Sequence, residues 1–213
     1  TVVAWGWNFG GRTNVPPGLT NVVAVSSSYR HSLALRKDGT VAIWGDDSQT
    51  NFVTGLSNVI AIAAGFDNTT ALLNDGTVVG NNPNMPAGLS NVVSIAADNS
   101  RGMALFTNGT VQYWAAYGFG TVGDPPTDMT NIVAIACGQD NFLVQRPDGT
   151  ITAWGAGQYE WALFPNYGQS FPPTGLKRVI SLIGARRRGM LLYAVPPKPF
   201  NLSNSGYTDN GVF

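Results

Sequence analysis

The segment that decides the fold reads His31-Ser32-Leu33-Ala34-Leu35-Arg36-Lys37-Asp38-Gly39-Thr40-Val41-Ala42-Ile43-Trp44-Gly45. Two β-prone segments flank the central Asp-Gly-Thr turn, and an Asp-Gly pair supplies the positive φ angles of a tight hairpin. The turn signature recurs at residues 75–77, 108–110 and 148–150, at spacings of 37, 33 and 40 residues. The segment is therefore one copy of an internal repeat.

A second marker precedes each hairpin and occurs five times. It begins with Leu or Met, which is followed by two polar residues and two β-branched residues, at Leu19, Leu56, Leu89, Met129 and Leu176. Twelve residues after each of these, a polar residue opens the next strand: His31, Asn68, Arg101, Asn141 and Arg188. The constant offset indicates five copies of one structural unit.

Each unit predicts three strands, which in the first copy span residues 22–25, 32–35 and 40–44. The first strand is apolar without alternation, which indicates burial on both faces. A Pro-rich loop links successive units, because proline cannot join a strand ladder. One such sheet cannot bury both faces alone, but stacked neighbours can. The sequence therefore predicts an all-β protein, a β-propeller of five short three- to four-stranded blades over residues 1–194.

The phase of the repeat predicts how the propeller closes. The chain begins with a third-strand segment, residues 2–6, and its fifth unit ends after the second strand, at residues 189–193. We expect the N-terminal strand to complete the last blade. Residues 195–213 are a Pro-rich linker and a polar tail that resembles the start of a further module.

The repeat resembles that of the regulator of chromosome condensation family over residues 22–45, through His31-Ser32-Leu33-Ala34-Leu35 and Trp44-Gly45. It is similar to the bacterial short-repeat branch that includes a propeller-type β-lactamase inhibitor protein. The resemblance implies a propeller that usually has seven blades, so a fragment of a seven-bladed ring is the alternative to a closed ring of five. It implies binding activities: nucleotide exchange on a small GTPase, chromatin contact and enzyme inhibition.

The inhibitor branch implies that the loops between first and second strands form the binding surface. In this chain they provide the candidate partner-binding residues Tyr29, Arg30, His31, Phe66, Asp67, Arg101, Asp140, Arg186, Arg187 and Arg188. A loop over residues 155–174 adds Tyr159, Trp161, Phe164 and Tyr167, which suit a protein or carbohydrate surface or pack on the propeller edge. The arginines of the last loop lack interleaved aromatic residues, so a solvated edge is favoured over nucleic-acid binding.

Composition and motifs argue against several function classes. Charged residues make up 11% of the chain and the formal net charge is zero, so nothing overall suggests a polyanion partner. His31 is the only histidine and Cys137 the only cysteine. No nucleophile motif or zinc-ligand spacing accompanies them, and no apolar run reaches the length of a membrane span. We expect neither an enzyme nor a bound cofactor or metal.

These observations predict a non-catalytic protein-interaction scaffold in a larger, secreted or surface-associated protein. Two alternatives stay open. One is a structural subunit of a fibre, virion or other assembly, which would self-associate through propeller edges. The other is a propeller that binds carbohydrate between its blades.

Overall fold

The computed structural model describes residues 1–45, 55–66, 68–98, 101–115, 126–138, 141–155, 179–185 and 188–193, and for the last two segments it describes the backbone alone. A short 3-10 helix, η1 (Phe9–Gly11), precedes the strands. The strands are β1 (Val22–Ser27), β2 (His31–Arg36), β3 (Val41–Gly45), β4 (Val59–Ala64), β5 (Thr69–Leu73), β6 (Val78–Gly80), β7 (Val92–Asp98), β8 (Arg101–Phe106), β9 (Val111–Ala115), β10 (Ala134–Cys137), β11 (Asn141–Gln145), β12 (Ile151–Gly155), β13 (Val179–Ala185) and β14 (Arg188–Tyr193).

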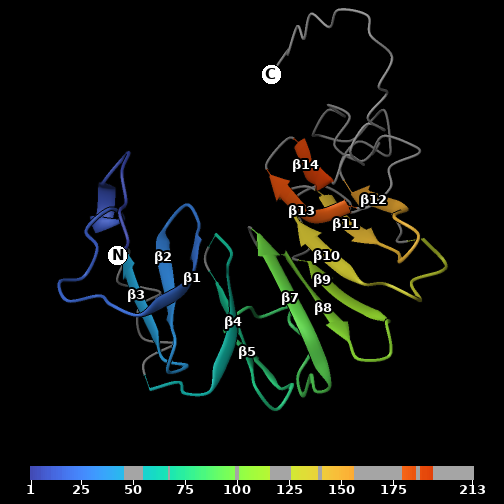
Figure 1. The fold of residues 1–213 in the computed structure, drawn as a ribbon, viewed down its shortest axis with the longest axis horizontal. Coiled ribbons are helices and arrows are strands. Elements are labelled where there is room, and N and C mark those ends of the chain that lie inside the picture. The colour runs from blue at the N-terminus through green and yellow to red at the C-terminus, as the bar shows by residue number, and fades with distance from the viewer. Residues whose placement is uncertain are drawn as a thin grey trace, which may run out of the picture.

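The described strands form one antiparallel sheet per repeat. Four sheets have three strands in chain order, β1-β2-β3, β4-β5-β6, β7-β8-β9 and β10-β11-β12, and a fifth pairs β13 with β14. Figure 1 shows these sheets following one another along an arc, from the blue first blade to the orange β13 and β14. The predicted all-β propeller with five repeat units is confirmed.

The hydrophobic core lies between neighbouring blades. Met103 and Leu105 of β8 pack with Ile132, Phe142 and Trp154 of the following unit. Likewise, Leu72 of β5 packs with Val92 and Trp114 of the following unit. The middle strands are therefore the most deeply buried; all five residues of β11 are buried. Each blade depends on its neighbours for burial, as predicted for stacked repeat units. The expectation that the first strands are buried on both faces was wrong, because Val23, Ile60 and Val93 are more than half exposed.

The hairpin turns have a different geometry from the one expected from Asp-Gly. In the hairpin turn of the first blade Gly39 has a positive φ of 79°, and Asp38 does not share it. The Gly39 N–H donates to the Arg36 carbonyl at 3.0 Å, and the Arg36 N–H donates to the Thr40 carbonyl at 2.9 Å. This is a three-residue loop that ends in a left-handed glycine. The expectation of two positive φ angles was wrong.

Asp38 has a separate role in that turn. Its carboxylate accepts hydrogen bonds from the Thr40 N–H at 3.0 Å and from the Thr40 hydroxyl at 2.7 Å. Asn108 makes the same two contacts to Thr110, at 3.0 and 2.7 Å. An acceptor at the first position and a hydroxyl at the third therefore explain the Asp/Asn-Gly-Thr signature.

The two sequence markers meet at the joint between blades. The Gly39 carbonyl accepts a hydrogen bond from the Val59 N–H of the next blade at 3.1 Å. A Cβ added to Gly39 would lie 3.0 Å from Cα of Asn58. Asn58 itself has a positive φ of 59°. Gly76 and Gly109 repeat the hydrogen bond to Val92 and Ile132, at 3.0 and 2.9 Å. The turn of one unit thus fits against the asparagine marker of the next.

The expected completion of the last blade by the N-terminal strand is not observed. Residues 2–6 form no strand, and the sheet of β13 and β14 has two strands. Val2 packs instead against the first-blade cluster of Leu19, Ala34 and Trp44. Local packing on the first blade therefore replaces the predicted pairing, and the described blades form an open arc (Figure 1).

Because no described blade precedes it, β1 is less covered than its counterparts. Val25 of β1 is 62% exposed, whereas the equivalent Ile62 and Ile95 pack against inter-blade clusters. Val22 is half-buried, while Val59 and Val92 are 3% exposed. The first blade therefore presents a face that the other units cover.

Candidate functional site: an aromatic and arginine surface

Aromatic and arginine side chains gather at one end of the first two blades. Tyr29 and Arg30 come from the β1–β2 loop and Phe66 from the β4–β5 loop. The segment around η1 brings three more side chains to them, those of Trp7, Phe9 and Arg12. We call these six residues the aromatic–arginine surface.

Stacked contacts connect all six side chains. The Tyr29 and Phe66 rings stack with centroids 4.9 Å apart and planes 6° from parallel. The Arg12 guanidinium lies over Tyr29, 4.8 Å from the ring centroid, and that of Arg30 lies over Phe66 at 5.2 Å. Arg12 also lies over Trp7 and Phe9, at 5.0 and 5.4 Å. Each such cation–π contact contributes about 0.5–1 kcal/mol at an exposed site.

Backbone contacts hold Arg12 in this position. The Arg12 carbonyl accepts a hydrogen bond from the buried Trp44 indole N–H at 2.9 Å. Asn8 fastens the preceding loop, because its side-chain oxygen accepts from the Thr13 N–H and its amide donates to Asn14, both at 2.9 Å. The N-terminal segment is thereby tied to the first blade, which fixes the guanidinium before any partner binds.

The surface is exposed and carries an uncompensated positive charge. Trp7, Phe9 and Tyr29 are 66%, 64% and 52% exposed. No residue in the described part of the chain forms an ion pair with Arg12 or accepts a hydrogen bond from its guanidinium. Its Nε is buried without a partner there. Exposed aromatic rings beside arginine are typical of binding surfaces.

Two predicted contact residues lie elsewhere. His31 is fully buried; its Nε2 lies 2.9 Å from the Thr69 hydroxyl of the next blade, and its Nδ1 lies 3.3 Å from the Ser28 hydroxyl. Arg101 is 4% exposed. Both open a second strand, and this position is buried in the described blades instead of facing a partner. The structure therefore removes His31 and Arg101 from the candidate surface.

The structure brings together Tyr29, Arg30 and Phe66 among the predicted contact residues. The other predicted residues lie outside the described residues: Asp67, Asp140, Tyr159, Trp161, Phe164, Tyr167, Arg186 and Arg187. Arg188 begins β14, and its side chain is not described. Sequence reasoning missed Trp7, Phe9 and Arg12. The signal available was the aromatic density of Trp5-Gly6-Trp7-Asn8-Phe9 ahead of the first complete unit.

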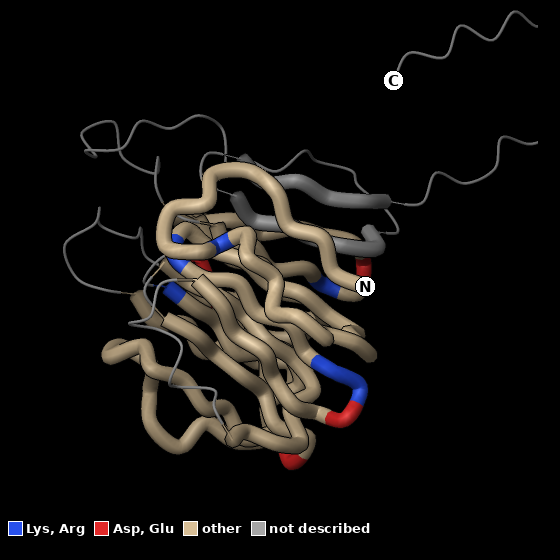
Figure 2. The backbone as a smooth tube through the Cα atoms, turned by 90° about the vertical axis from the view of Figure 1, so that its left-hand side faces the viewer, with Lys and Arg blue, Asp and Glu red and all other residues tan. Residues whose placement is uncertain are grey.

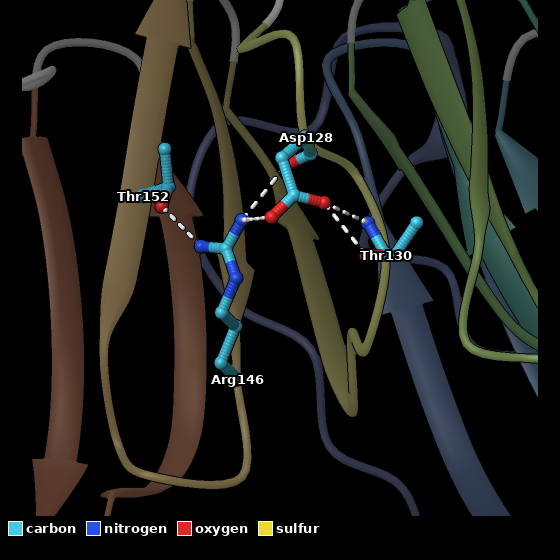
Figure 3. A network of polar contacts seen from close by, with 4 residues as sticks. All are labelled: Asp128, Thr130, Arg146 and Thr152. Atoms are coloured by element: carbon cyan, nitrogen blue, oxygen red, sulfur yellow. Dashed lines mark hydrogen bonds and ion pairs between the residues drawn. The ribbon is translucent and has the colours of Figure 1, made fainter.

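A second polar cluster has a structural role. Arg146 donates to the Asp128 carbonyl at 2.7 Å and to the Thr152 hydroxyl at 2.9 Å, and pairs with the Asp128 carboxylate at 3.7 Å (Figure 3). Hydrogen bonds from Thr130, followed by the nearby charge of Arg146, lower the pKa of Asp128. Exposed pairs of this kind contribute about 0–1 kcal/mol. The cluster fastens the loop before β10 to the fourth blade.

The described residues offer little else for chemistry. Figure 2 shows charged residues mainly at the ends of the strands, with long uncharged stretches between them. No group of three or more metal-ligating side chains occurs within the described ranges. Burial raises the pKa of the Cys137 thiol well above its ordinary value. In the part of the chain that the structure describes, no helix has the length and apolar character to cross a membrane.

Short antiparallel blades that pack through inter-blade cores, with a contact surface on the loops at one end, define the class of β-propellers. Within that class, residues 22–49 match the regulator of chromosome condensation (RCC1) repeat. The match includes the turn and the Trp44-Gly45 pair from which the resemblance was inferred, and it confirms that resemblance. A search of curated proteins by sequence gave no match.

Solved structures confirm the fold. The WD40 ectodomain of the Arabidopsis thaliana receptor kinase ACR4 matches with a TM-score of 0.63 at 20% identity, covering 85% of this chain and 64% of that one. Prp20p from Saccharomyces cerevisiae matches with a TM-score of 0.61 at 17% identity, covering 84% and 58%. Human WBSCR16 matches with a TM-score of 0.58 at 19% identity, covering 82% and 58%. The chain thus spans about three fifths of these propellers, which fits the alternative of a fragment of a larger ring.

Proposed function

We propose that the chain is a non-catalytic protein-interaction scaffold whose aromatic–arginine surface makes the contact. The observation that carries this proposal is the stacked set of exposed rings around the Arg12 guanidinium, held in place by the Trp44 hydrogen bond. Tryptophan, tyrosine and arginine dominate the binding energy of protein interfaces. A surface that is already ordered loses less entropy on binding.

Two similar structures support a binding role. The Prp20p structure is described together with its binding to Gsp1p and histones, and yeast RCC1 (Prp20) has also been solved bound to Kap60. An extracellular or surface-associated setting for this chain is part of the proposal. Neither likeness names the partner of this chain, which must be identified directly.

Single substitutions test the surface. The wild-type chain, Tyr29→Ala and Arg12→Ala would be used as bait in parallel affinity purifications, and a protein lost with both variants would be purified for calorimetry. We expect Tyr29→Ala to weaken that binding by about 2 kcal/mol, roughly 30-fold, because it removes the ring that contacts Arg12, Phe66 and Trp7.

Val23→Ala is the matched control, because Val23 is 61% exposed on the first blade and belongs to none of the ring contacts. Its binding should equal that of the wild type. If every protein captured by the wild-type chain were captured equally by Tyr29→Ala and Arg12→Ala, the contacts would lie on another surface and the proposal would be contradicted.

The uncovered face of β1 favours a second candidate function, that of a self-associating structural subunit. An exposed strand face is a site at which chains pair. Light scattering over a dilution series separates the candidates. A monomer at all concentrations argues against self-association, and a concentration-dependent dimer or larger species supports it.

A further inference from the structure

We propose that the aromatic–arginine surface recognises an acidic protein segment that presents both carboxylates and apolar side chains on one face. This inference rests on the proposed function and adds the chemistry of the partner. Three observations support it. They are the contacts made by the ring faces, the absence of a carboxylate partner for Arg12 among the described residues, and the length of the row of stacked groups.

Contacts within the surface engage the faces of the Tyr29 and Phe66 rings. Tyr29 stacks on Phe66 and has Arg12 over its ring, and Phe66 has Arg30 over its own. Trp7 and Phe9 stack on each other at 5.6 Å and share the same guanidinium. Ring faces are negative and ring edges positive. Because cations and other rings engage the faces, the exposed edges favour negatively charged groups.

Arg12 adds a full charge to that electropositive surface. In the described part of the chain it has no carboxylate partner, and its buried Nε has no acceptor. Its remaining N–H groups form a fork that matches a carboxylate in a bidentate manner. A carboxylate from a partner would pair with a charge that has no carboxylate partner among the described residues, beside the rings that the guanidinium contacts.

The same geometry disfavours nucleic acid and sugar as ligands. Single-stranded nucleic acid binds by stacking its bases on free aromatic faces, and sugar rings use the same faces. Here stacking within the surface engages the faces of Tyr29 and Phe66. A peptide requires no free face, because its apolar side chains pack against ring edges while its carboxylates reach the guanidinium.

The row of stacked groups is long enough for about two same-face repeats of an extended segment, although its spacing is shorter than that repeat. From Arg12 to Tyr29 to Phe66 to Arg30, successive groups lie 4.8, 4.9 and 5.2 Å apart. Side chains on one face of an extended strand repeat every ~6.5–7 Å. A segment of a few residues therefore spans the surface, with one carboxylate at Arg12 and apolar side chains over the paired rings.

The test compares three labelled probes on the full chain by fluorescence anisotropy. One is a peptide of about 12 residues with the repeat Glu-Ser-Leu-Ser, which places Glu and Leu on the same face when extended and is long enough to cross the surface. The second has Gln in place of each Glu, and the third is an oligo(dT) of matched length. We expect the Glu peptide to bind at least about tenfold more tightly than the Gln peptide, and its affinity to fall with added salt.

Arg12→Gln should reduce the difference between the two peptides to less than about threefold, while Arg12→Lys should keep part of it. Lys37→Gln is the matched control, because it removes one exposed positive charge from a hairpin turn and keeps the backbone bond to Asn21. It should leave both affinities unchanged. Thermal melting of each variant shows whether the fold is intact.

Each contrary result has a distinct meaning. Equal binding of the Glu and Gln peptides, lost in Tyr29→Ala, would keep the binding surface and overturn its preference for acid. Tighter binding of oligo(dT) than of the Glu peptide would overturn the partner class. Binding of neither peptide would overturn this inference while leaving the scaffold proposal to the measurement with its own purified partner.

Discussion

Gly39 occupies the point where two blades meet, and its lack of a side chain serves two purposes. Its φ of 79° is a left-handed conformation, and the space beside its Cα is filled by the Asn58 backbone. Gly18 has a similar φ of 75°, but a Cβ added there would meet nothing within 4 Å. A comparison of substitutions at Gly39 and Gly18 therefore separates two free-energy costs: that of the left-handed backbone and that of the contact with the next blade.

We expect Gly18→Ala to lower the free energy of unfolding by about 1 kcal/mol, the cost of a left-handed alanine. Gly39→Ala should lower it by about 2–4 kcal/mol, because the added methyl group also pushes the next blade away. Urea unfolding of the two variants measures the difference. Equal losses would show that the joint tolerates a methyl group.

The turn carboxylates make the stability of the fold depend on pH. Hydrogen bonds from the turn threonines lower the pKa values of Asp38, Asp75 and Asp148 below the ordinary 3.8. A carboxylate with a lowered native pKa stabilises the fold fully above pH 3.8, and this contribution is lost as the pH falls through the native pKa. Asn108 fills the same position without titrating.

A triple variant with Asp38→Asn, Asp75→Asn and Asp148→Asn should therefore match the wild type near neutral pH and lose less stability on acidification. Urea midpoints at about pH 7 and pH 3 test this, with both proteins still sharing the titration of Asp128. An identical loss in both proteins would show that the turn hydrogen bonds do not couple to stability.

At the scale of the elements, the repeat predicted the strands well. The hairpins around each Gly and the first strands appear where the markers place them, because period and turn chemistry act locally. Contacts between elements were harder to predict. His31 and Arg101 directly follow the loops between first and second strands in sequence, yet the first residue of the second strand is buried in the four blades whose side chains are described. Similarly, Arg12 reaches the candidate surface through a long-range bond to Trp44, which no local pattern encodes.

His31 links two blades, so its removal should have a coupled effect. His31→Ala should lower the free energy of unfolding by about 2–3 kcal/mol, because it leaves a cavity and removes the acceptor or donor facing Thr69. A double-mutant cycle with Thr69→Val should give a coupling of about 1 kcal/mol. If the two single variants lose amounts of unfolding free energy that simply add in the double variant, the cost of removing His31 comes from the cavity alone.

At the scale of the whole molecule, the fold class follows from the sequence but ring closure does not. Residues 2–6 have the pattern of a third strand, yet they lie beside the first blade, where Val2 joins a hydrophobic cluster. Closure depends on the position of the last blade relative to the first, which is a sum of rotations that the sequence pattern does not specify.

The open arc predicts uneven protection from hydrogen exchange. The Val59, Val92 and Ile132 N–H groups donate to a turn glycine of the preceding blade, and no described blade offers that carbonyl to Val22. The Val22 amide should therefore exchange faster than its three counterparts. Equal protection in a dilute sample would mean that β1 is covered in solution, and light scattering would then identify a second copy of the chain.

The joint between units also has an evolutionary consequence. Each of the first four units has a turn glycine and an asparagine marker, so each of them carries both halves of the contact seen at the three described joints. Duplication of one of these units in the gene, or deletion of the second or third, leaves the junctions among them matched. Lineages that inherit this repeat can therefore change the number of blades in one genetic step, without having to evolve a new interface.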